Sequence, residues 1–117
     1  MGFLLYILAF IMFIPLTIIN IIIVLWKNPN LKTLNRYFFE GAIDIDRFGN
    51  RNFRSLFNLI LRKKNGYSFG NEKETISSVL GKNKANNRLS ILGVLICKIL
   101  NFLDKNHVEK SIRYNLK

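Results

Sequence analysis

The chain has 117 residues, of which 18 are Lys or Arg, 7 are Asp or Glu and one is His, giving a formal net charge of +11. This length suits one small domain, and with half of the residues hydrophobic the composition excludes a chain that is disordered throughout. Residues 1–26 contain no charged side chain, so the whole net charge lies in residues 27–117. The chain therefore divides into an uncharged apolar part and a strongly basic part.

The apolar part has the properties of a membrane anchor. Residues 3–26 are interrupted only by Pro15, Thr17 and Asn20, and as a helix they would extend about 36 Å, enough to cross a hydrocarbon core of about 30 Å. No basic residue precedes this segment and no small-residue cleavage site follows it, which favours an uncleaved anchor over a signal peptide. We predict a transmembrane anchor over residues 1–26. Because basic residues follow it, the amino terminus is expected outside and the remaining chain in the cytoplasm.

The basic part predicts a small helical domain. Residues 27–33 are expected to form a juxtamembrane turn, because Pro29 and its neighbouring asparagines disfavour a continuing helix. Apolar residues at helical spacing predict helices over residues 34–45, 53–64, 71–80 and 89–103, and a short terminal helix. Gly49-Asn50 is expected to break the chain between the first two. The predicted fold class is all-α: a single transmembrane helix, then a basic cytoplasmic domain of three to five short helices over residues 34–117.

Two helix starts are indicated by a polar residue followed three positions later by Glu. Asn71 is expected to cap the helix over residues 71–80, with Glu74 reaching back to it as in a capping box, and Gly81 is expected to end that helix. The same spacing recurs in the terminal helix, whose expected start and inner face are Asn106, Glu109, Val108, Ile112 and Leu116.

The segment over residues 89–103 is apolar almost all round, with Ser90, Lys98 and Asn101 as a narrow polar stripe. Fifteen residues of helix extend only about 22 Å, which is short for a second membrane crossing. Two interpretations remain open: a core helix of the domain, or a helix that lies in the membrane interface.

Few residues are candidates for catalysis, disulfide formation or metal binding. One His and one Cys, Cys97, exclude an internal disulfide and an intramolecular zinc site with the usual four ligands, and no cofactor, metal or small-molecule substrate is predicted. A hydrolase with Ser77 or Ser78 as nucleophile, His107 as base and Glu74 as the orienting carboxylate is a remote alternative, since nothing in the sequence brings these groups together. We expect His107 to cap or pack, and we predict no catalytic residue.

The basic surplus is the strongest signal. A cytoplasmic domain beside an anionic leaflet gains about 1 kcal/mol for each Lys or Arg held near the surface. Nucleic acid would also be attracted, but without sequence specificity. The candidate lipid- or nucleic-acid-binding residues are Arg51, Arg54, Arg62, Lys63, Lys64, Lys82, Lys84 and Arg88.

Three stretches, residues 46–53, 69–83 and 103–112, resemble a group of small bacteriophage and prophage proteins. The shared pattern is an acidic-Glu-Thr-Ile-Ser-Ser run followed by Gly-Lys, and later Leu-Asp-x-x-His. The chain departs from it at Val108, where the pattern has Cys. The resemblance implies a phage origin and carries no established activity. The motif residues, to which it assigns no role, are Asn71, Glu74, Thr75, Ser77, Ser78, Gly81, Lys82 and His107.

These observations predict a non-enzymatic, phage-encoded single-pass membrane protein whose basic domain binds at the membrane face. The expected partners are the bilayer with its anionic lipid, a phage structural or host protein, or nucleic acid. Two alternatives are a structural protein in the internal membrane of a lipid-containing virion, and a lysis or membrane-remodelling protein.

Overall fold

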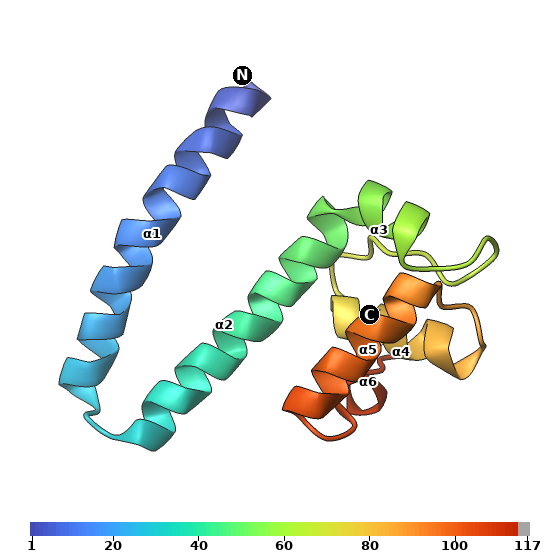
Figure 1. The fold of residues 1–117 in the computed structure, drawn as a ribbon. Coiled ribbons are helices and arrows are strands. Elements are labelled where there is room, and N and C mark those ends of the chain that lie inside the picture. The colour runs from blue at the N-terminus through green and yellow to red at the C-terminus, as the bar shows by residue number, and fades with distance from the viewer. Residues whose placement is uncertain (115–117) are drawn as a thin grey trace. The chain divides into compact units, whose positions relative to one another are not determined.

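The computed structural model describes residues 1–114 (Figure 1). Within them the regular secondary structure is entirely helical, as the sequence predicts. The helices of this part of the chain are α1 (Gly2–Lys27), α2 (Leu31–Asn52), α3 (Arg54–Ile60), α4 (Ile76–Ala85), α5 (Ile91–Leu103) and α6 (His107–Lys110). The chain divides into two compact units, unit 1 (Met1–Gly41) and unit 2 (Ala42–Lys117).

Helix α1 of unit 1 is apolar and exposed along most of its length, with no buried residue. Pro15 lies inside it, and the Thr17 hydroxyl donates to the Phe13 carbonyl at 2.6 Å. A hydroxyl satisfied within its own helix is compatible with lipid around it. The turn that follows is shorter than the predicted residues 27–33, since α2 already begins at Leu31, where the Asn30 side chain accepts from the Thr33 N–H at 2.7 Å.

The predicted break at Gly49-Asn50 is wrong, because α2 continues through both residues. Gly49 is buried, and a Cβ at this position would lie 3.1 Å from the Ile76 side chain. Asn50 is fully buried, and its amide donates to the carbonyl oxygens of Asn71 and Glu74 at 3.0 and 2.8 Å. Two residues that usually mark a turn are therefore used for close packing and for buried hydrogen bonds to a distant segment.

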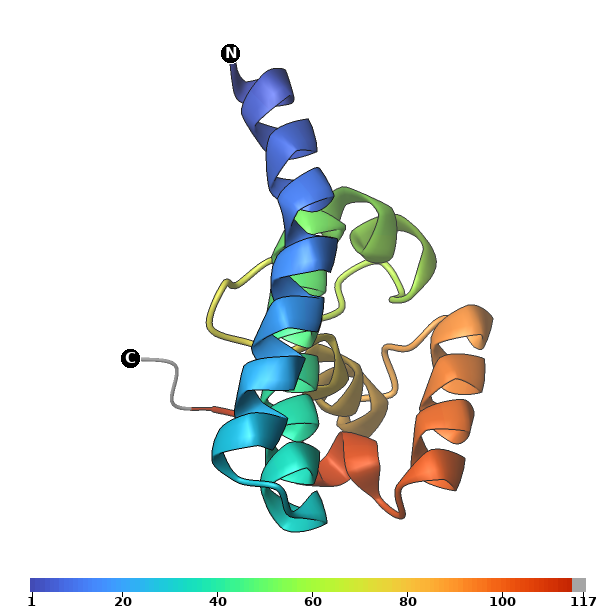
Figure 2. The same ribbon diagram turned by 90° about the vertical axis from the view of Figure 1, so that its left-hand side faces the viewer.

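The core of unit 2 lies where α4, α5 and α6 pack against one another (Figures 1 and 2). Val79 and Leu80 of α4 are fully buried at its centre. The other buried apolar residues around them are Leu61, Phe69, Leu89, Cys97 and Val108. At Gly93 of α5 a Cβ would overlap the Leu61 carbonyl, so this helix touches the neighbouring backbone directly.

Helix α3 is shorter than the predicted helix over residues 53–64. It ends at Ile60, with Leu61 as its C-cap, because the next residues pair with the segment that precedes α5. The Lys63 N–H donates to the Arg88 carbonyl at 2.7 Å, and the Ser90 N–H donates to the Leu61 carbonyl at 3.2 Å. Ser90 then caps α5, accepting from the Gly93 N–H at 3.0 Å.

The predicted cap at Asn71 is also wrong. Helix α4 starts at Ile76, and its cap is Thr75, whose hydroxyl accepts from the Ser78 N–H at 3.0 Å. The Asn71 side chain accepts instead from the Lys73 N–H at 2.9 Å within a turn. Gly81 does not end this helix, which runs on to Ala85.

The terminal helix is a four-residue α6. Asn106 precedes it, as predicted, but has a φ of 58° and makes no side-chain cap. Glu109 binds Lys84 and Asn101 rather than a helix start. Val108 is buried as expected, while Leu116 lies outside the described residues.

Candidate functional site

Glu74, just before α4, and Lys82, within α4, form a buried ion pair. The Glu74 carboxylate is fully buried, and its Oε2 lies 2.7 Å from the ammonium nitrogen of Lys82. The Ser78 hydroxyl donates to the same oxygen at 2.6 Å, and the Tyr67 hydroxyl donates to the other at 2.8 Å. Both oxygens of this carboxylate therefore have hydrogen-bond partners, as a charge removed from water requires.

Glu74 stabilises the charged form of Lys82. Burial acts against the charged form of Lys82, but hydrogen bonds to Glu74 and Tyr67 outweigh it and leave the pKa of Lys82 raised. Burial, together with the hydrogen bond to Glu74, also raises the pKa of Tyr67. Lys82 also lies 4.3 Å from the centre of the Tyr67 ring. With 6 % of Lys82 exposed, the assignment of this residue to the binding surface is wrong.

Next to the pair, Asn83 fixes the loop before α4. It is fully buried, accepts from the Tyr67 N–H at 2.7 Å, and donates to the carbonyl oxygens of Tyr67 and Val79 at 3.0 and 3.2 Å. These contacts hold Tyr67, and with it the hydroxyl that reaches Glu74.

A second row of polar side chains contains the histidine. The Ser77 hydroxyl oxygen lies 3.1 Å from His107 Nε2, and His107 Nδ1 lies 3.0 Å from an oxygen of Asp104. Lys110 donates to the other Asp104 oxygen at 3.1 Å. Hydrogen bonds from His107 and Lys110 lower the pKa of Asp104. The structure thus brings Ser77 and His107 together, with Asp104 as the third member in place of Glu74.

An acyl-transfer nucleophile needs access for a substrate, whereas Ser77 is enclosed. Ser77 is 3 % exposed. The Asp46 carboxylate accepts from the Ile76 N–H at 2.7 Å and from the Ser77 hydroxyl at 3.2 Å, so it occupies the amino-terminal end of α4. Burial raises the pKa of Asp46, although these hydrogen bonds oppose the shift. The contacts of this row connect α2, α4 and α6.

Ser78, the other serine of the predicted alternative, has no contact with the histidine. Its hydroxyl binds Glu74 and accepts from the Arg113 N–H at 2.9 Å. The two adjacent serines therefore belong to two separate hydrogen-bonded groups.

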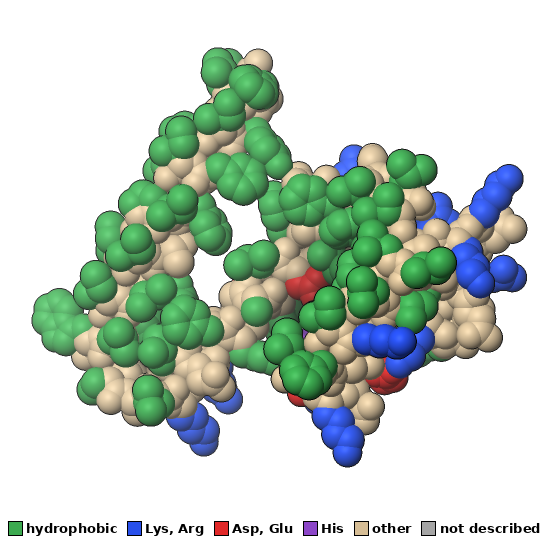
Figure 3. Space-filling view, in the orientation of Figure 1, with side chains coloured by type: hydrophobic (Ala, Val, Ile, Leu, Met, Phe, Trp, Pro, Cys, Tyr) green, Lys and Arg blue, Asp and Glu red, His purple; other side chains and the backbone are tan. Residues whose placement is uncertain are grey.

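The most exposed apolar surface of unit 2 is on α5. Its inner side packs through Gly93 and Cys97, while its opposite side, here called the α5 outer face, points to solvent (Figure 3). Ile91 and Phe102 are 92 % and 88 % exposed. The face consists of Ile91, Leu92, Val94, Leu95, Ile99, Phe102 and Leu103, with Lys98 among them. Soluble monomers rarely leave such a continuous apolar helix face in water.

The predicted basic residues are not equivalent. Lys63, Lys64 and Arg88 are exposed, and within residues 1–114 no acceptor holds their side chains. Arg51 is also exposed, and Arg54 donates to its carbonyl at 2.7 Å. Lys84 pairs with Glu109, and Arg62 is half-buried in hydrogen bonds within its own loop. Free charge therefore lies at Lys63, Lys64 and Arg88, next to the backbone contact between Lys63 and Arg88, and also at Arg51.

Sequence reasoning missed Asp46, Tyr67 and Asp104. Only Asp104 had a local signal, because Asp and His three residues apart share one side of a helical turn. Asp46 and Tyr67 reach the site through tertiary contacts that no local pattern encodes.

Comparisons of this chain with protein-family models, with curated proteins and with solved structures found no match. The resemblance to small phage proteins therefore stays a prediction. Within residues 1–114, no three His, Cys, Asp or Glu side chains lie together as a metal site requires. In the same part of the chain, α1 is the one helix long and apolar enough to cross a membrane.

Proposed function

We propose that this protein is a non-enzymatic, single-pass membrane protein whose unit 2 binds the surface of an anionic bilayer. In this proposal α1 spans the membrane, and the α5 outer face lies in the membrane interface. The buried polar side chains around α4 have a structural role. The observation that carries the proposal is the exposed α5 outer face, because it is apolar where a helix of a soluble domain is polar.

The length and composition of α5 suit the interface rather than a crossing. Thirteen residues of helix extend about 20 Å, less than the hydrocarbon core. An apolar helix face buries itself at the boundary between headgroups and acyl chains. Lys98, which lies within this face, can extend its ammonium group to the headgroups while its methylene chain stays among apolar side chains.

The free basic side chains supply the preference for anionic lipid. Lys63 and Lys64 follow α3 in the sequence, and Arg88 precedes α5. The Lys63 N–H donates to the Arg88 carbonyl, which brings these basic residues together near the start of α5. At about 1 kcal/mol for each charge near an anionic surface they contribute about 3 kcal/mol, and this part of the binding weakens with salt. Basic residues after α1, at positions 27, 32 and 36, support a cytoplasmic location for unit 2.

The test uses the full chain in lipid nanodiscs, with a nitroxide label on the lipid acyl chains. The expected result is that backbone amide signals of α5 broaden while those of α4 do not, and that the broadening increases when phosphatidylglycerol replaces part of the phosphatidylcholine. The variants Ile91→Asp and Phe102→Asp should reduce the broadening, because each places a charge on the α5 outer face.

The matched control is Ser68→Asp, which adds the same charge at an exposed loop position outside that face. Equal effects of Ser68→Asp and Ile91→Asp would mean that net charge alone governs binding. Unbroadened α5 amides in both lipid mixtures would contradict the proposal. The α5 outer face could instead be covered by a second copy of the chain. In that case sedimentation would show a dimer, and the proposal would also be wrong.

A further inference from the structure

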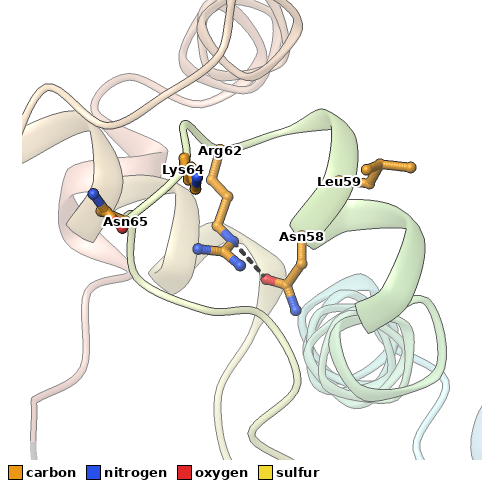
Figure 4. A pocket seen from close by; sticks show the side chains of 5 residues that line it. All are labelled: Asn58, Leu59, Arg62, Lys64 and Asn65. Carbon is orange, nitrogen blue, oxygen red and sulfur yellow. Dashed lines mark hydrogen bonds between the residues drawn. The ribbon is translucent and has the colours of Figure 1, made fainter.

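A basic pocket lies beside the backbone hydrogen bond between Lys63 and Arg88. It has a volume of about 410 Å³ and opens between the end of α3 and the turn that follows. Its lining residues are Asn58, Leu59, Arg62, Lys64 and Asn65 (Figure 4). Two of these side chains are cationic and none is acidic, so the lining favours an anion.

The guanidinium group of Arg62 is fixed in position before any ligand arrives. Its Nε donates to the Asn58 side-chain oxygen at 3.0 Å, the contact drawn in Figure 4, and its Nη1 donates to the Gly66 carbonyl at 2.9 Å. Asn58 is held in turn by the backbone of Phe69, to which it donates at 3.1 Å and from which it accepts at 2.7 Å. A guanidinium has five N–H donors, so three remain for a ligand, and their orientation costs no further side-chain entropy.

The side chains of the other two polar lining residues, Lys64 and Asn65, donate no hydrogen bond to the described residues. Both residues are exposed. Leu59 is 79 % exposed and gives the pocket an apolar edge. A planar guanidinium, an ammonium and an amide in one lining provide donors for the oxygens of a phosphate group.

We propose that this pocket binds a phosphate monoester group, the chemistry shared by a lipid headgroup such as that of phosphatidic acid and by free phosphate. Two cationic side chains match the double negative charge of a monoester better than the single charge of a diester. That the ligand comes from a lipid rests on the proposed membrane function, because the Lys63–Arg88 backbone contact places the pocket next to the start of α5. Binding of the phosphate group itself does not depend on the membrane.

The test is a titration of the full chain in dodecyl maltoside micelles, which contain no phosphate. Backbone amide shifts of residues 58–66 are recorded against inorganic phosphate, phosphatidic acid and phosphatidylglycerol. Saturable shifts with both monoester species are expected, with weaker binding of the diester. Phosphatidic acid binding more tightly than inorganic phosphate identifies a lipid as the source, and equal affinities identify a soluble phosphate compound.

Two pairs of variants distinguish a pocket from diffuse charge. Lys64→Gln should weaken binding about five-fold, the equivalent of one surface cation, whereas Lys73→Gln, which removes an exposed charge outside the lining, should leave it unchanged. Asn65→Asp places a carboxylate in the pocket and should abolish binding. Its control is Asn87→Asp, at an exposed Asn outside the pocket that has a similar positive φ, 56° against 71°.

Equal losses of affinity for Lys73→Gln and Lys64→Gln, or amide shifts that never saturate, would contradict binding in this pocket. This failure is distinguishable from failure of the membrane proposal. The nanodisc experiment reports on α5 broadening, which the Asn65→Asp variant should largely retain.

Discussion

The sharpest prediction concerns the Glu74→Gln variant. Glutamine has nearly the same shape as glutamate, and its amide can still meet the Ser78 and Tyr67 hydroxyls, since a hydroxyl turns to accept where it previously donated. What glutamine cannot do is balance the charge of Lys82, which is only 6 % exposed. The substitution therefore isolates the electrostatic part of the buried pair.

The expected loss follows from the burial of both partners. Removing one member of a buried ion pair costs about 3–5 kcal/mol, because the other charge is left without compensation. Unit 2 spans 76 residues, from 42 to 117, so its free energy of unfolding is of the order of 4–11 kcal/mol. For a domain of this size 1 kcal/mol shifts Tm by about 4–8 °C, so Glu74→Gln should lower Tm by at least about 12 °C.

The assay is thermal unfolding of the full chain in a non-ionic detergent, followed by hydrogen exchange of the α4 amides. Glu109→Gln is the matched control, because it makes the same chemical change in an exposed pair with Lys84 and should cost at most about 1 kcal/mol. The double variant Glu74→Gln, Lys82→Met should recover much of the loss, since it leaves no buried charge. A Glu74→Gln variant that melts within about 4 °C of the parent would refute the reasoning.

Two further predictions concern packing and pH. Gly93→Ala should destabilise unit 2 by about 1–3 kcal/mol because its Cβ would overlap backbone, whereas Gly41→Ala, where nothing lies within 4 Å, should not lower the unfolding temperature. The free energy of unfolding should fall as the pH rises above about 10, because the folded chain holds the protons of Tyr67 and Lys82, whose pKa values are raised, at a pH where the unfolded chain releases them. Urea unfolding between about pH 9 and about pH 11 measures this slope, and Tyr67→Phe should make it shallower; an unchanged slope would contradict the role of Tyr67.

Local sequence patterns predicted the helical class, the apolar first helix and the position of α5 within two residues. These features depend on residue spacing alone, because residues three or four positions apart lie on the same face of a helix. The inner and outer faces of α5 could not be distinguished, because both are apolar. Only the neighbours that cover Gly93 and Cys97 show which side is buried.

The errors share a physical cause. Gly49 and Asn50 favour turns in isolation, but tertiary hydrogen bonds and close packing keep them in a helix here. Asn71 does lie in a turn, but Thr75 caps the helix that follows. Lys82 was assigned to the surface by its charge. Its spacing from Glu74 and Ser78, at intervals of four residues, was a signal that the three share one side of a helix. That spacing suggests contact between them but not burial.

The contacts that complete α4 come from both ends of unit 2. Asp46 supplies the carboxylate at its start, and the Arg113 N–H binds Ser78 from the far end of the described chain. Asp46 and Arg113 are far apart in the sequence, so these contacts form only when distant parts of the chain meet, which slows folding because the intervening loop must close first. A chain truncated between α5 and α6 would lack both the buried Val108 and the Arg113 contact to Ser78, and its α4 would remain incompletely packed.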